Sequence, residues 1–85
     1  MCDLAVASAE STFATSGINY GLFCSTPAVG ISRTMHPKQA FDMLVTGDFI
    51  TAEEAVRRGL INQTVDKSEL DSRVLQLSTK IASQV

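Results

Sequence analysis

The sequence has few of the residues that small domains use to reinforce their folds. Among 85 residues there are two cysteines, one histidine and no tryptophan. Two cysteines, Cys2 and Cys24, cannot build a disulfide framework, and no Cys/His cluster has the spacing of metal ligands. A chain of this length buries only roughly 60–65% of its extended surface. We therefore expect the core of the isolated chain to be marginal and to depend on contacts outside the chain.

Excess positive charge and long apolar runs are also missing. Seven Lys and Arg are outnumbered by nine Asp and Glu, for a net charge of −2. No basic run is present, which argues against a nucleic-acid partner. No stretch approaches the length of a membrane span, so none is expected. Asp3 and Glu10 do not fit a transit peptide, and no basic start precedes an apolar run. We expect no targeting segment in this chain.

The first part of the chain predicts short extended segments. Residues 2–7 form an apolar run that indicates a buried strand, and residues 12–14 favour a second extended piece. Gly17 and Gly21 then enclose a segment typical of a loop, with two positions at which the backbone is permissive.

The remainder favours helices. Residues 25–27 place hydroxyl side chains before a proline, which predicts a capped helix start. A second helix is expected from His36-Pro37, with apolar residues at helical spacing (Ala40, Phe41, Leu44 and Val45), to a glycine terminator at Gly47. A capping box predicts a third start: Thr51 is the cap, and Glu54 follows three residues later. That helix should end at Gly59.

Residues 60–65 are consistent with an edge strand or an extended link. Asp66 or Ser68 is expected to cap a final helix, whose apolar residues form one stripe: Leu70, Val74, Leu77 and Ile81. The stripe could pack against the chain's own core or against a neighbouring subunit. One or two short strands followed by about four helices predict an α/β fold class. Since parallel strands need neighbours, the pattern indicates an incomplete unit.

Three blocks of sequence, taken in order, resemble one family. They are C-D-L-A-V-A-S at 2–8, T-F-A-T-S-G-I-N-Y-G-L at 12–22 and L-V-T-G-D-F-I-T-A-E-E-A-V-R-R-G-L-I at 44–61. The third is the most characteristic, because it places two helix terminators and a capping box at fixed offsets from one another. The chain thus resembles the enoyl-CoA hydratase/isomerase (crotonase) family. Within it, the run G-L-F-C-S-T-P-A-V-G at 21–30 is similar to one mitochondrial subgroup.

The resemblance implies a fold and an assembly. Residues 1–85 would form about the third quarter of a family domain, a partial crotonase spiral built from ββα turns. Members are usually trimers or pairs of trimers, and their ligand is an acyl-CoA thioester. The resemblance implies no further cofactor.

Hydration of an enoyl thioester needs backbone N–H donors at the thioester oxygen and acid/base groups, two glutamates in this family. By resemblance, the donors and the first glutamate lie upstream of Cys2. The second glutamate corresponds to Gly17, which has no titratable group. No catalytic residue is therefore expected in this chain, and as written it should not turn over substrate. In a full-length protein, replacing Gly17 with glutamate should create or raise hydratase activity.

The candidate substrate-binding residues follow the same motif. Gly17 and Gly21 could line the acyl pocket or be plain turn glycines. Leu22, Phe23 and Cys24 could form the wall for the acyl chain or belong to ordinary core packing. Cys24 is not expected to be a nucleophile, because no His or Lys is evident that would activate it.

Other polar residues have structural interpretations. His36 is expected to be a helix cap or a surface side chain. Glu53 and Glu54 point about 100° apart on a helix, so they are not expected to act as an acid/base pair. Arg57 and Arg58 could meet CoA phosphates, but a solvated last helical turn is the preferred interpretation.

Three functional hypotheses remain. The first is part of an enoyl-CoA hydratase-like protein of fatty acyl-CoA metabolism, mitochondrial by resemblance. The second is a non-catalytic family member that binds acyl-CoA or acts through regulation or assembly. The third is a partial gene product without a function of its own.

Overall fold

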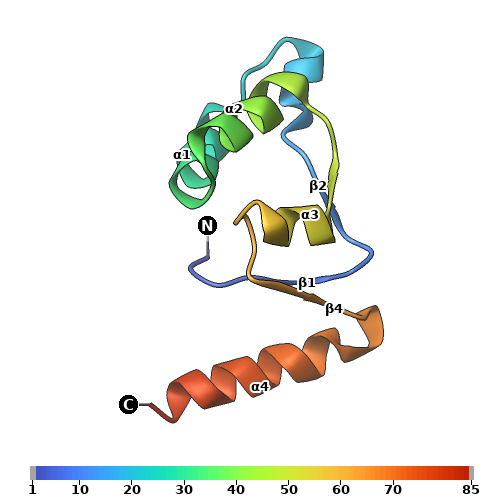
Figure 1. Ribbon diagram of the computed structural model, residues 1–85, viewed down its shortest axis with the longest axis vertical. Helices are drawn as coiled ribbons and strands as arrows, with labels where there is room; N and C mark the ends of the chain where they lie inside the picture. The colour runs from blue at the N-terminus through green and yellow to red at the C-terminus, as the bar shows by residue number, and fades with distance from the viewer. Residues whose placement is uncertain (1, 85) are drawn as a thin grey trace.

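The computed structural model describes residues 2–84, and within that range the chain forms four α-helices and four short strands (Figure 1). In chain order, the strands are β1 (Val6–Ser8), β2 (Thr12–Phe13), β3 (Ile50–Thr51) and β4 (Gln63–Val65). The helices are α1 (Ser25–Thr34), α2 (Pro37–Thr46), α3 (Ala52–Arg57) and α4 (Leu70–Ala82), with 3₁₀ turns η1 (Ser16–Tyr20) and η2 (Lys67–Glu69). The α/β class is confirmed, although two of the strands lie between the helices.

The strands form two separate two-stranded sheets. β1 pairs in parallel with β4, with Val6 opposite Gln63 and Ser8 opposite Val65. β2 pairs antiparallel with β3. Just before β1, Asn62 extends the pairing with both its side chain and its backbone. Its side-chain Oδ1 accepts from the Ala5 N–H at 2.8 Å, and its backbone N–H donates to the Ala5 carbonyl at 2.9 Å. Two-stranded sheets are marginal alone, so helix packing has to support them.

The first strand differs from the sequence prediction. It begins at Val6 rather than at Cys2, and only Ser8 within it is buried. The apolar run at 2–7 suggested a fully buried strand. In the structure, β4 covers one edge of β1 over a three-residue register, and Cys2 to Leu4 stay exposed. The prediction of an extended strand therefore holds only from Val6, and the prediction of burial is wrong for Cys2 to Leu4.

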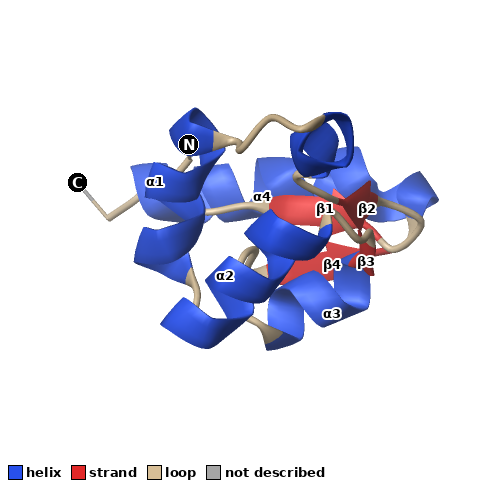
Figure 2. Ribbon diagram, turned by 90° about the horizontal axis from the view of Figure 1, so that it is seen from above, coloured by secondary structure: helices blue, strands red, loops and turns tan. Residues whose placement is uncertain are grey.

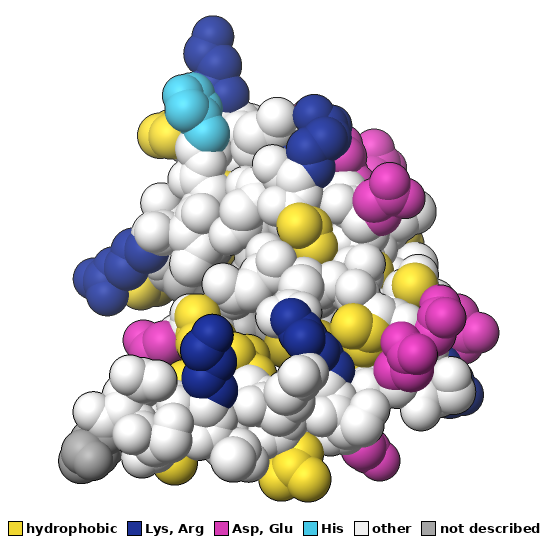
Figure 3. All heavy atoms as spheres, turned by 60° about the horizontal axis from the view of Figure 1, so that its bottom comes forward, with side chains coloured by type: hydrophobic (Ala, Val, Ile, Leu, Met, Phe, Trp, Pro, Cys, Tyr) yellow, Lys and Arg dark blue, Asp and Glu magenta, His cyan; other side chains and the backbone are white. Residues whose placement is uncertain are grey.

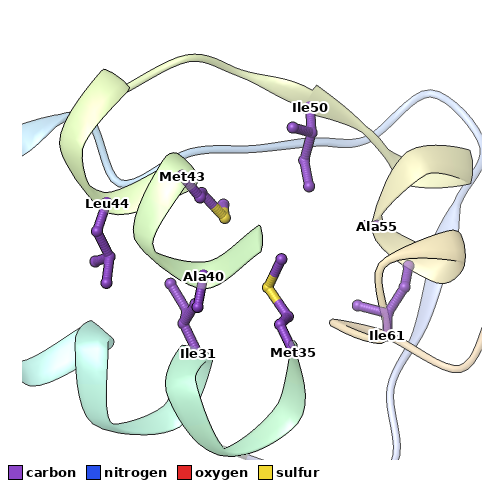
Figure 4. Packing of buried hydrophobic residues seen from close by; sticks show 8 residues of the cluster. All are labelled: Ile31, Met35, Ala40, Met43, Leu44, Ile50, Ala55 and Ile61. Carbon is purple, nitrogen blue, oxygen red and sulfur yellow. The ribbon is translucent and has the colours of Figure 1, made fainter. Parts of the chain in front are cut away.

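The core lies between α1, α2, β3 and α3 (Figure 4). Figure 4 shows the side chains of α1 pointing toward those of α2, with residues of β3, α3 and the following turn closing the side. The buried cluster consists of Ile31, Met35, Ala40, Met43, Leu44, Ile50, Ala55 and Ile61. Two of the four residues predicted for the α2 face are not in it, since Phe41 is 62% exposed and Val45 is 41% exposed.

The last helix lies outside this core. Figure 1 shows α4 along the β1 and β4 strands at the far end of the molecule from α1 and α2, and none of its residues is buried. The stripe at Leu70, Val74, Leu77 and Ile81 is therefore only half covered by the described chain. Seen from above, α1 and α2 lie on one side and the strands are grouped together beside α3 (Figure 2).

This arrangement makes the molecule elongated. Its radius of gyration is 14.3 Å, and its extents are 44 × 28 × 19 Å. A compact domain of this length has a radius of gyration of about 12 Å. The chain is therefore more extended than a compact domain, and apolar side chains remain on its surface (Figure 3). The expected dependence on contacts outside the chain stays a prediction. No helix within residues 2–84 combines the length and the apolar character needed to cross a bilayer.

Candidate functional site

The segment with the candidate glycines is a 3₁₀ turn followed by a short loop. η1 runs from Ser16 to Tyr20, and Gly21 ends it in the left-handed region at φ 78°. The N–H of Gly21 donates to Ile18 O at 3.1 Å, and the N–H of Leu22 donates to Gly17 O at 3.0 Å. The sequence predicted two permissive backbone positions. Only Gly21 uses a positive φ, while Gly17 lies inside the turn.

At position 17, the lack of space for a side chain favours glycine, whereas the backbone dihedral angle φ does not, because it is not positive. A Cβ added there would lie 2.9 Å from Cys24 Sγ and 3.0 Å from Leu22 O. Both distances are shorter than ordinary van der Waals separations of about 3.5–4.0 Å. At Gly21, by contrast, an added Cβ would meet nothing within 4 Å. Glycine is therefore favoured at position 17 by close packing and at position 21 by the left-handed backbone conformation.

A shallow groove of about 480 Å³ brings Gly17 and Cys24 together. Its walls come from β2 and the residues that follow it, the start of η1, the N-cap and one face of α1, α2 and the turn after α3. The lining residues are Thr12, Phe13, Ala14, Thr15, Ser16, Gly17, Cys24, Pro27, Ile31, Met43 and Leu60. None of them is charged, and none is a histidine. The groove can therefore accommodate an apolar ligand, and apart from the Cys24 thiol its lining carries no ionisable side chain.

The other three candidates lie outside this groove. Gly21 is exposed, Leu22 is 68% exposed and Phe23 is 48% exposed. Ordinary core packing within the described chain is thus wrong for Leu22 and Phe23. Their contact with an acyl chain remains a prediction. They directly precede Cys24, which lines the groove, in the sequence.

The start of α1 also differs from the prediction. Cys24 is the N-cap, and its side chain makes no capping hydrogen bond; Ser25 is already helical. The expected hydroxyl cap is therefore absent from this helix start. The Ala28 N–H donates to Cys24 O at 2.9 Å, which fixes the Cys24 backbone at the helix end. Since the groove has no His or Lys, nothing in its lining would activate the thiol.

Two predicted caps are confirmed. His36 Nδ1 accepts from the Lys38 N–H at 3.3 Å at the start of α2, so the imidazole is a cap. Thr51 Oγ1 accepts from the Glu54 N–H at 3.1 Å at the start of α3. The second half of the expected capping box is not formed, because the Glu54 carboxylate pairs with two arginines instead.

These arginines differ from each other. Arg57 is exposed and hydrogen-bonded to Glu54, and this bond holds the pKa of Glu54 below its ordinary value and raises that of Arg57. Arg58 is not solvated as predicted: its side chain is only 17% exposed. Its Nε lies 3.3 Å from Glu54 Oε1, and its Nη1 lies 3.7 Å from Asp42 Oδ2, beyond hydrogen-bond distance. Arg58 thus links α3 to α2, which disfavours a role in binding CoA phosphates.

Sequence reasoning missed the remaining walls of the groove. Phe13, Pro27, Ile31, Met43 and Leu60 come from segments far apart in the chain. No local pattern relates them, and only the packing of α1 and η1 on α2 and of β2 on α3 brings them together. A motif match to neighbouring residues could indicate Gly17, but it could not indicate these partners.

Comparisons with known proteins match this chain over nearly its whole length. The family model described as enoyl-CoA hydratase/isomerase matches residues 1–85. Enoyl-CoA hydratase domain-containing protein 3, mitochondrial, of Mus musculus is 50% identical over 82 residues, which cover 96% of this chain and 27% of that protein. The short-chain-enoyl-CoA hydratase of Clostridium acetobutylicum is 33% identical over 86 residues, covering 96% of this chain and 32% of that protein.

Solved structures agree with the sequence comparisons. The human enoyl-CoA hydratase domain-containing protein 3 matches with a TM-score of 0.91 at 49% identity, over 96% of this chain and 32% of that chain. An enoyl-CoA hydratase of Mycobacterium smegmatis matches with the same TM-score of 0.91 at 51% identity, over 94% of this chain and 31% of that chain.

These matches confirm that the chain resembles enoyl-CoA hydratase domain-containing protein 3 and has the crotonase type of fold. The chain spans about 27–32% of the length of the curated relatives described above. It belongs to the enoyl-CoA hydratase/isomerase family.

Proposed function

We propose that this chain is part of an enoyl-CoA hydratase/isomerase-like protein of fatty acyl-CoA metabolism and that, as an 85-residue chain, it does not turn over substrate. The observation that carries the proposal is the uncharged groove beside Gly17. By family resemblance, this is the position of an acid/base glutamate. The ligand is an acyl-CoA thioester, and the proton-transfer chemistry of the family needs no additional cofactor.

The groove lacks the groups that hydration requires. A general acid or base has to reach the reacting atom within hydrogen-bond distance and must have a pKa near the working pH. The three hydroxyl residues of the lining, Thr12, Thr15 and Ser16, do not titrate in that range. Thr15 is also committed elsewhere, because its hydroxyl donates to Met43 O at 2.9 Å. We infer that binding, rather than acid/base chemistry, is what these residues can contribute.

The proposed partner is a second copy of the protein, in a trimer or hexamer. Support comes from the apolar side chains that the described chain leaves exposed, among them Leu75 at 67% and Phe49 at 68%. The proposed compartment is the mitochondrion, and support comes from the names of the similar proteins in Mus musculus, Rattus norvegicus and Homo sapiens.

A second function is favoured by Gly17 itself. Loss of an acid at the reaction site is what a non-catalytic acyl-CoA-binding or regulatory member of the family would show. Such a protein would retain the apolar walls at Phe13, Pro27 and Ile31 without the glutamate. The two functions differ in whether the complete protein hydrates an enoyl thioester.

Binding and turnover by the 85-residue chain test its proposed ligand and inactivity, whereas the same turnover assay on the complete protein separates the two functions. Equilibrium dialysis of the 85-residue chain against a short acyl-CoA, with free CoA as the control, measures whether the acyl part contributes to binding. Hydration of crotonyl-CoA, followed by loss of the enoyl absorbance, measures turnover. We expect acyl-dependent binding without turnover. Turnover by this chain would overturn the proposed inactivity, and binding that does not depend on the acyl part would overturn the ligand assignment.

The intact mass of the endogenous protein that contains residues 44–61 separates the first function from the third hypothesis. A mass several times that of this chain means that catalysis is a property of residues outside it. A mass equal to that of this chain means that the short form exists, and that its function has to be sought in binding.

A further inference from the structure

Gly17 and Cys24 meet at one wall of the groove. The Sγ of Cys24 lies 2.9 Å from the place that a Cβ on residue 17 would occupy. Cys24 is half-buried, and Cys2, the other cysteine, is exposed. The thiol therefore fills space that a side chain on residue 17 would otherwise need.

A second atom restricts the same space, but it is part of the backbone. Leu22 O lies 3.0 Å from the added Cβ. The N–H of the same residue donates to Gly17 O at 3.0 Å, which ties Leu22 to the η1 turn. The sulfur belongs to a side chain and is the obstacle that a substitution can remove, whereas the backbone carbonyl remains in every side-chain variant.

We propose that Cys24 is the side chain that a substituent on residue 17 has to displace, so that placing an acid at this position of the groove also requires a smaller residue at position 24. The inference rests on the proposed function only for the part that concerns an acid. Its steric part concerns the contact between residues 17 and 24, with Leu22 O as the second obstacle.

The inference changes what replacing Gly17 by glutamate would test. The sequence suggested that this single substitution would raise hydratase activity in a full-length protein. In the structure, a glutamate at position 17 would displace the Cys24 side chain or open η1 before its carboxylate reached the groove. An acid at this place requires Cys24 to be replaced by a smaller residue as well.

Rescue by a smaller residue tests the pair without any ligand. Backbone amide hydrogen exchange of residues 16–22 is measured for the wild-type chain, Gly17→Ala, Cys24→Ala and the double variant. We expect Gly17→Ala to accelerate exchange by roughly tenfold, the change that corresponds to about 1.4 kcal/mol. The double variant should recover part of this loss, with a remainder due to Leu22 O. Cys24→Ser, which keeps an atom at the γ position, should rescue less than Cys24→Ala.

Gly21→Ala is the matched control. It introduces the same methyl group on the same segment, at a residue with φ 78° and no atom within 4 Å of the added Cβ. Its cost is backbone strain, so Cys24→Ala should not rescue it. Equal rescue of both glycine variants, or no rescue of Gly17→Ala, would overturn the proposal. The proposal is also wrong if these amides exchange at free-peptide rates in the wild-type chain.

Thiol reactivity gives a second measurement. In a Cys2→Ser background, the alkylation rate of Cys24 should rise in Gly17→Ala, because the added methyl group pushes the sulfur outward. An unchanged rate would contradict the contact. Neither measurement uses acyl-CoA, so a failure of the proposed function and a failure of the steric pair are distinguishable.

Discussion

Replacing Gly47 with alanine should cost more stability than any other glycine-to-alanine change in η1 or α2. Gly47 ends α2 at φ 67°, where its N–H donates to Met43 O at 3.3 Å. The same carbonyl accepts the Thr15 hydroxyl at 2.9 Å. An added Cβ would lie 2.7 Å from Asn19 Oδ1 and 2.8 Å from Ile18 Cγ2. The end of α2 and the η1 turn are therefore packed directly on this glycine.

The magnitude follows from two separate penalties. A residue with a Cβ in the left-handed region costs about 1–2 kcal/mol. Overpacking of a tight contact adds about 1–3 kcal/mol. Together they reach about 2–5 kcal/mol, against a total of about 4–13 kcal/mol for a domain of this length. Gly21→Ala, which carries only the first penalty, should cost about 1–2 kcal/mol.

Hydrogen exchange of the α2 and η1 amides, measured by NMR, gives the local opening free energy. Gly47→Ala should lower the protection of both elements by at least roughly fivefold more than Gly21→Ala does, because the overpacking penalty is at least about 1 kcal/mol and each factor of ten corresponds to about 1.4 kcal/mol. Adding Asn19→Ala should restore part of the loss, since it removes the Oδ1 contact. Equal losses in the two glycine variants would refute the steric argument and leave only the dihedral one.

Four further predictions concern stability. Thr51→Ala should destabilise α3 by about 1 kcal/mol through loss of its N-cap, measured as the local opening free energy. Arg58→Ala should lower the free energy of unfolding by about 1 kcal/mol, because its contacts to Asp42 and Glu54 are lost. Arg57→Ala, at the exposed arginine, is the control and should lower it less. Equal losses in the two variants would contradict the assigned link between α3 and α2. Because the pKa of Glu54 is lowered from 4.5, its stabilising effect is present above that pH and is lost as the pH falls through the lower folded value. A pH titration of helical circular dichroism should show this loss, and Glu54→Gln should remove it. Finally, the isolated chain should be poorly soluble and unfold with little cooperativity, so a sharp thermal transition from a monomer would show that its core is stronger than its exposed apolar surface suggests.

The features that the sequence predicted well depend on one residue and its immediate neighbours. Gly47 ends α2 because a left-handed terminator favours glycine, and Thr51 caps α3 because a hydroxyl reaches the N–H three residues on. His36 as a cap follows the same logic. Each of these is decided within one turn of helix, so no knowledge of the fold was needed.

The features that the sequence did not predict depend on which elements meet. Helical spacing placed Phe41 and Val45 on the same face as Ala40 and Leu44, but α1 covers only part of that face, and Met43 takes the remaining place in the core. Spacing identifies a stripe but not how much of it a neighbour covers. The stripe of α4 is only half covered by the described chain for the same reason.

The candidate site shows the same division. Gly17 was found from a local motif, but the motif gave no hint that Cys24 fills its side-chain space. That contact depends on the turn at Gly21, which reverses the chain so that the entry to α1 comes back onto η1. Motif resemblance located the position, and only the packing showed why a glycine occupies it.

The block at 44–61, on which the resemblance to the family was recognised in the sequence, has a packing role. Ala52 and Ala55 are fully buried, so larger side chains would not fit between α3 and the core. Gly59 has φ 88°, and a Cβ there would lie 2.9 Å from Thr34 O. With Gly47, these residues account for the small-residue pattern of the block by sterics alone.

Packing motifs specify a fold, and a fold does not specify a reaction. Apart from Leu60, the residues of the 44–61 block contribute nothing to the lining of the groove. Gly17, at the position where the family resemblance implies a glutamate, lies in a different block. The family model matches residues 1–85, so membership of the family does not by itself say what the groove does. Because Cys24 Sγ lies against the side-chain space of residue 17, we expect that restoring an acid at position 17 also requires a change at Cys24.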